Sequence, residues 1–158
     1  MRQLINRMVP QQIDNQYRGQ KIALWLFGFI VFFKASQMVF TIMDGYSTIR
    51  DADGIPLDTY PVAAAHTIVA VSALSAFTYL VFCFICTVVL VRYRSAVPSM
   101  FALLLLQYPS RLVILHFLPI VRVGSPPGVT VNLALFGIMV VGFALSVWPR
   151  RKTVSSTL

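Results

Sequence analysis

The sequence predicts an all-α integral membrane protein, a four-helix bundle with both termini in the cytoplasm. Apolar residues make up 58% of the 158 residues and charged residues only 11%, a composition typical of chains that lie in lipid. The apolar residues also form four runs long enough to cross a bilayer, without the alternation of a β-strand. Helices are expected because they satisfy their own backbone hydrogen bonds in lipid.

The four spans follow in order from the polar residues that bound them. Lys21 precedes the first run and Asp44-Gly45 ends it; basic residues follow the second and fourth runs, and a Gly/Pro-rich stretch follows the third. We therefore predict one domain, 1–158, with helices at 22–43, 61–91, 97–121 and 127–148, an outer loop at 44–60, and cytoplasmic tails at 1–21 and 149–158. A cleavable signal peptide ending near Ala35-Ser36 is disfavoured, since the polar segment before the first run exceeds a usual n-region.

Basic residues predict the orientation, because short cytoplasmic loops carry the excess of lysine and arginine. One predicted side has only Arg50 and Arg122. The other side has nine basic residues: Arg2, Arg7, Arg18, Lys21, Arg92, Arg94, Arg150, Arg151 and Lys152. This pattern indicates a multi-pass protein of the plasma membrane, in bacteria the inner membrane. The net charge of +8 is then explained by topology and by attraction to anionic lipid, not by nucleic-acid binding.

A polar layer is expected inside the spans. Lys34 lies about 18 Å along the first helix and Arg111 about 21 Å along the third, at 1.5 Å per residue. Gln37 lies one turn above Lys34, Gln107 one turn below Arg111, and Asn132 near the same depth on the fourth helix. A cation at this depth is costly unless it is paired or hydrated, so these five residues form the candidate ligand-binding site.

The counter-anion for this layer is missing from the spans. The chain has no glutamate, and four of its five aspartates fall in the 44–60 loop. The negative charge could come from an acidic ligand, a lipid headgroup, an acidic residue of a partner's membrane helix, or a loop aspartate such as Asp58. The alternative is that Lys34 and Arg111 only extend outward to the interface. Pro109, between Gln107 and Arg111, is expected to kink or interrupt the third helix.

Two cysteines in the second span, Cys83 and Cys86, form a C-x-x-C motif. In helix number and in this spacing the chain resembles the membrane thiol oxidoreductases of the DsbB and vitamin K epoxide reductase type, which use quinone as electron acceptor. That resemblance implies a redox role for the pair. A second cysteine pair, which those proteins use for exchange, is absent from this sequence. Buried cysteines that pack as small apolar residues are the competing interpretation.

His66 and His116 raise a second redox alternative, in which both imidazoles would bind one haem. Counted from the outer ends of their helices the two histidines are level. Counted from the inner ends they differ, at about 39 Å and 28 Å. Hydrogen bonding of each histidine at the interface is the competing interpretation, and we expect no haem.

No arrangement of side chains typical of an enzyme is visible. The 44–60 loop lacks the ligand spacing of an EF-hand, and its Asp53-Gly54 pair is typical of a turn. We therefore predict no metal site and no catalytic residues. The expected function is the binding of an acidic or quinone-like ligand, a lipid or a partner helix at the polar layer, with haem or thiol/quinone redox chemistry as the alternative. The cofactor stays open, and a homo-oligomer is possible.

Overall fold

The computed structural model describes residues 15, 17 and 19–148, and all of the regular structure within them is helical. Its four long helices are α2 (Lys21–Met43), α4 (Val62–Arg92), α5 (Val97–Phe117) and α6 (Pro127–Val147). Each lies in a segment long and apolar enough to cross a membrane. The prediction of four long apolar helices is therefore confirmed. Of the predicted tails at 1–21 and 149–158, residues 1–14, 16, 18 and 149–158 lie outside the described residues.

Helix ends match the prediction within one residue except in α5, which ends at Phe117 instead of continuing to residue 121. The cause is Pro119, because the residue before a proline is pushed out of the helical region. Leu118 accordingly caps the helix with φ −125° and ψ 76°. α5 runs through Pro109 without a break, so this proline does not interrupt the helix, and the expected kink stays a prediction.

The 44–60 segment is folded, although it was expected as a plain loop. It contains α3 (Gly45–Ser47), the π-helical turn η1 (Thr48–Ala52) and the 3-10 turn η2 (Leu57–Thr59). Ile49 and Leu57 are buried against Ala65 of α4 and form a small core of their own. The segment is therefore held against the start of α4.

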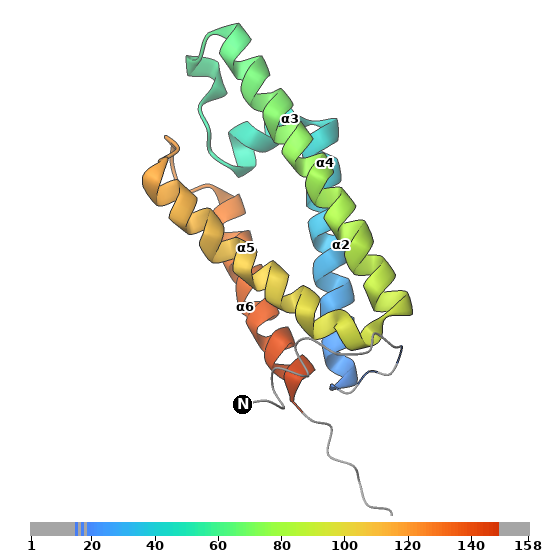
Figure 1. The fold of residues 1–158 in the computed structure, drawn as a ribbon. Helices are drawn as coiled ribbons and strands as arrows, with labels where there is room; N and C mark the ends of the chain where they lie inside the picture. Colours follow the sequence, from blue (N-terminus) through green and yellow to red (C-terminus); the bar gives the residue numbers. More distant parts are fainter. Residues whose placement is uncertain (1–14, 16, 18, 149–158) are drawn as a thin grey trace, which may run out of the picture.

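Each long helix packs along at least one neighbouring long helix, and the packed pairs form three of the four sides of the molecule (Figure 1). α2 packs along α4 and along α6, and α5 packs along α6. α4 and α5 are joined by the short turn η3 (Arg94–Ala96), and from this turn they diverge. The fourth side, between α4 and α5, therefore widens toward the end of the molecule that carries the 44–60 segment.

The main apolar core lies in the half of the molecule near η3. The ring of Phe27 from α2 meets the ring of Phe101 from α5 edge to face, with centroids 4.9 Å apart. Gly142 of α6 lies so close to Phe101 that a Cβ there would come within 2.7 Å of the ring. Close packing of this kind is typical of helix interfaces in membranes, where small residues let helices approach.

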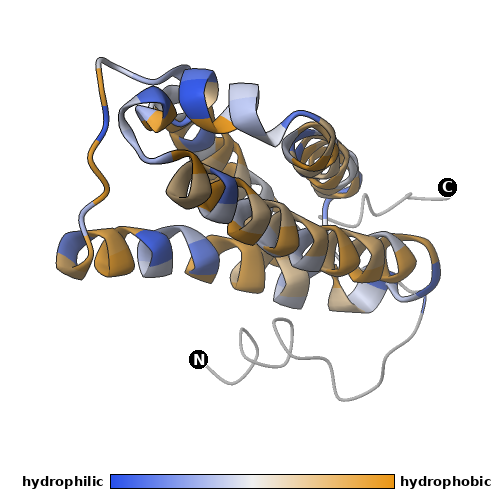
Figure 2. Cartoon of the chain, turned by 90° about the horizontal axis from the view of Figure 1, so that it is seen from above, coloured by the Kyte–Doolittle hydropathy of each residue, from blue (hydrophilic) through white to orange (hydrophobic). Residues whose placement is uncertain are grey.

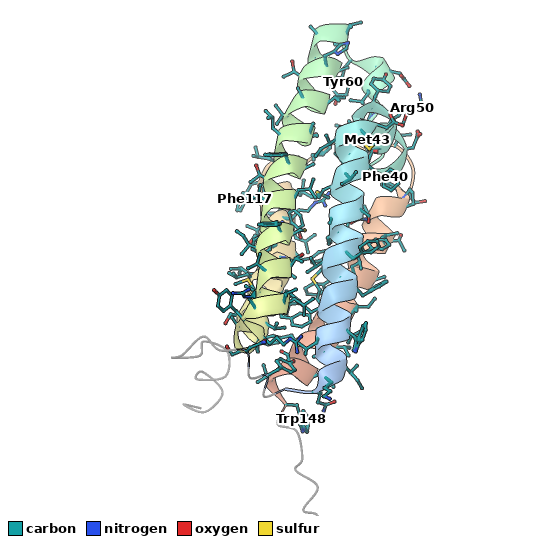
Figure 3. The ribbon with its side chains drawn as sticks, turned by 90° about the vertical axis from the view of Figure 1, so that its right-hand side faces the viewer. Phe40, Met43, Arg50, Tyr60, Phe117 and Trp148 are labelled. Carbon is teal, nitrogen blue, oxygen red and sulfur yellow. The ribbon has the colours of Figure 1, made fainter. Side chains whose placement is uncertain are left out.

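The two ends of the molecule carry different residues. Figure 3 shows Trp148 at one end and Met43, Arg50 and Tyr60 at the other. Figure 2 shows apolar residues along the long helices and hydrophilic residues mainly in the connections and at the helix ends. The backbone N–H of Val123 donates to the carbonyl of Gly54 at 2.9 Å, so the α5–α6 connection lies beside the 44–60 segment.

Candidate functional site

A cavity of about 1020 Å³ lies beyond the main core, toward the 44–60 segment. All four long helices and the 44–60 segment line it. The five residues predicted as the binding site all contribute to its wall: Lys34, Gln37, Gln107, Arg111 and Asn132. The structure therefore brings the whole predicted layer to one cavity, although the residues come from three different helices.

Lys34 points into this cavity and not out to lipid. Its Nζ donates a hydrogen bond to Oδ1 of Asn132 on α6, at 2.5 Å. The Nδ2 of Asn132 donates in turn to the carbonyl of Gly128, one turn earlier in α6, at 2.8 Å. Because the amide nitrogen is held by this backbone carbonyl, the amide oxygen is turned toward the ammonium. The simple picture of a lysine that extends to the interface does not describe this side chain.

The Lys34 ammonium has a neutral partner where an ion would be expected. Among the described residues, no carboxylate lies within ion-pair distance of it. Lys34 is half-buried and also lies within electrostatic range of the guanidinium of Arg111. One amide oxygen compensates a cation at mid-span only in part, since an ammonium has three donors.

Arg111 has an acidic partner, which belongs to the 44–60 segment. Its guanidinium lies 3.8 Å from Oδ1 of Asp53, with both side chains partly exposed. A loop aspartate was one of the expected sources of negative charge, but Asp58 was the residue suggested. Asp58 instead accepts a hydrogen bond from the hydroxyl of Tyr46 at 2.6 Å and lies 3.7 Å from Arg50.

Of the other charged residues of the 44–60 segment, Arg50 lies near Asp51 and Asp58, whereas Asp44 accepts a hydrogen bond from the backbone N–H of Ser47. Arg50 lies 3.0 Å from Asp51, and this bond raises the pKa of the guanidinium. The hydrogen bond to Asp58 likewise raises the pKa of Tyr46. These groups are exposed, so the pairs contribute little to stability. Among the described residues, no three His, Cys, Asp or Glu side chains gather as a metal site would require.

Sequence reasoning missed the contribution of α4. Ser72, Ser75 and Tyr79 line the cavity from this helix, and Gln107 lies close to the hydroxyl of Tyr79. The three α4 residues recur at i, i+3 and i+7, a spacing that puts them on one face of a helix. That polar stripe was a usable signal. Tyr108 of α5 also lines the cavity, and its ring stacks on the ring of Phe136 of α6.

The two alternative sites lie outside the cavity lining. His66 and His116 are both exposed, and the helix ends that carry them are apart in Figure 1. The ring of His116 lies beside Phe117, with centroids 5.5 Å apart. Cys83 and Cys86 are buried free thiols within the main core. Their position in the core fits the interpretation as small apolar residues. Haem binding and thiol redox chemistry stay alternatives.

No protein-family model matches the chain, and comparisons with curated proteins and with solved structures find no significant match.

Proposed function

We propose that the chain is a multi-pass membrane protein that binds a small acidic molecule in the cavity, with Lys34 as the anchor of its anionic group. One observation carries this proposal. The Lys34 ammonium faces the cavity from mid-span and is hydrogen-bonded to a neutral amide, without a carboxylate at ion-pair distance in the described part of the chain. An anion would supply the missing charge, and Arg111 stands on the same wall.

The size and lining of the cavity favour a small molecule. Ligand cavities usually enclose about 300–1,000 Å³ and combine apolar walls with a few placed polar groups. The cavity has that size, with apolar residues such as Val71 and Leu104 beside the polar ones. A partner's membrane helix, about 10 Å across with its side chains, needs more room over several turns. A quinone could also accept from Lys34, but its carbonyls would leave the charge uncompensated.

We also propose that both termini are cytoplasmic, in the plasma membrane, because lysine and arginine are concentrated in the terminal segments and in the α4–α5 connection of the sequence. The test uses single cysteines in a chain without Cys83 and Cys86. A membrane-impermeant maleimide is expected to label Thr59→Cys in intact cells and Ser156→Cys only after permeabilisation. Labelling of Ser156→Cys from outside would reverse the orientation.

The binding proposal is tested by native mass spectrometry of the full chain released from lipid particles. The wild type is expected to carry an acidic adduct that Lys34→Met loses. Lys21→Met is the matched control, because Lys21 is an exposed lysine at the start of the same helix and does not line the cavity. An adduct present equally in both variants, or in no sample, would contradict the proposal.

A further inference from the structure

The side of the cavity between α4 and α5 is open beyond the contact between Tyr79 and Gln107. Ser75 of α4 lines the cavity and is exposed, and so are Gln107 and Ser110 of α5. We call the gap between these residues the side opening. The helices diverge on this side (Figure 1), whereas α2 packs along α4 and α6, and α5 packs along α6. Because both helices are candidate membrane spans, the side opening faces lipid.

The end of the cavity, in contrast, is covered by the 44–60 segment. Asp53 reaches Arg111 across this end, and Gly54 accepts the backbone hydrogen bond of Val123. The carbonyl oxygen of Ala52 lies so close to Gly128 that a Cβ there would come within 2.5 Å of it. The segment therefore joins the α2–α4 side to the α5–α6 side above the cavity, between the cavity and the water at this end.

The edges of the side opening can accept hydrocarbon. The hydroxyl of Ser75 donates to the carbonyl of Val71 at 2.9 Å, and that of Ser110 donates to the carbonyl of Leu106 at 2.8 Å. Both serines are thus satisfied within their own helices and need no polar partner from a ligand. They are also small. Val71 and Ile114 continue the same edges with exposed apolar side chains that line the cavity.

From these features we infer that the ligand is an acidic amphiphile taken from the membrane, such as a long-chain carboxylic acid. Its carboxylate lies at Lys34, and its hydrocarbon chain leaves through the side opening into lipid. This inference rests on the proposed function and names the ligand class for the same site. Two features favour an amphiphile over a water-soluble acid: the side opening faces lipid, and the end of the cavity nearest water is covered.

The test compares radiolabelled oleate with radiolabelled propionate, which has the same head without the long chain. Both are added to the full chain in phosphatidylcholine nanodiscs, with protein-free nanodiscs as the blank. Ser75→Trp fills the side opening, and we expect it to weaken oleate binding by about tenfold or more, the loss of roughly two buried methylene groups. Thr78→Trp is the matched control and should leave the affinity within about twofold.

The control matches Ser75 closely. Thr78 is exposed on the same helix, its hydroxyl also donates one turn back, to Leu74 at 3.1 Å, and it does not line the cavity. If Ser75→Trp does not fold, Ser110→Trp closes the side opening from α5. Val113→Trp is then the control, because Val113 is exposed on the same helix and does not line the cavity.

The outcomes separate the two claims. Oleate binding that is lost in Ser75→Trp and kept in Thr78→Trp supports the inference. If propionate binds as tightly as oleate, or if the variants at the opening bind oleate like the wild type, the inference is wrong while Lys34-dependent binding, and with it the proposed function, stands. If neither acid binds to any protein, the inference is wrong, and the proposed function is decided by the acidic adduct that Lys34→Met should lose.

Discussion

Replacement of Asn132 by leucine is expected to lower the free energy of unfolding of the ligand-free chain by about 2 kcal/mol, the cost of removing a partner from a charged group away from water. Leucine has nearly the shape of asparagine but cannot accept the hydrogen bond from Lys34. The ammonium would then remain at mid-span without the amide oxygen. Thermal or denaturant unfolding of the purified chain measures the loss.

The cause of this loss is isolated by a double-mutant cycle. In a Lys34→Met background there is no ammonium to leave unpaired, so Asn132→Leu should cost little there. We expect a coupling of about 1–2 kcal/mol between the two positions, within the range for residues in direct contact. If the change in unfolding free energy of the double variant equals the sum of the two single changes, the Lys34–Asn132 bond contributes nothing.

Lys34→Met is expected to act in opposite directions on the free and the bound protein. Without ligand, the variant should be more stable by about 1 kcal/mol. The reason is that the cost of holding a charge at mid-span exceeds the contribution of the one hydrogen bond that is lost. With an acid at a hundred times its dissociation constant, the wild type should gain about 2.7 kcal/mol, and the variant should gain almost none of it. Melting curves with and without oleate measure both effects.

Lys21→Met again serves as the control for this comparison. It removes the same charge from the same helix, but at its exposed start. We expect it to keep the full stabilisation by oleate. A Lys34→Met protein that oleate protects as well as it protects the wild type would show that the ammonium takes no part in binding.

The sequence predicted the helices well because one physical rule decides them. A long apolar segment in lipid must satisfy its backbone internally, so Lys21–Met43 and Pro127–Val147 could be placed within one residue of their ends. Local proline chemistry shortened α5, and it was overlooked. Gly54 and Gly124 both have φ of +72°, as their turns require. The packing of η1 against α6 at Gly128 depends on contacts between distant segments, which no local pattern reveals.

The candidate layer was predicted mainly from depth. Residues at one depth can still point in different directions, and only the assembled helices show that Lys34 and Asn132 meet. Depth also could not identify Asp53 as the partner of Arg111, because the path of the 44–60 segment is set by its own small core. The α4 stripe was overlooked, although its spacing at i, i+3 and i+7 could be read from the sequence.

The position of the bound carboxylate relative to the Lys34 ammonium tests the account most directly. Solid-state NMR can measure it, with 15Nζ-labelled lysines and oleate labelled with 13C at the carboxyl carbon. The chain has three lysines, Lys21, Lys34 and Lys152. We predict through-space transfer between the carboxyl carbon and one lysine nitrogen, present in the wild type and in Lys21→Met and absent in Lys34→Met. Transfer that persists in Lys34→Met, or its absence from the oleate-loaded wild type, would contradict the account.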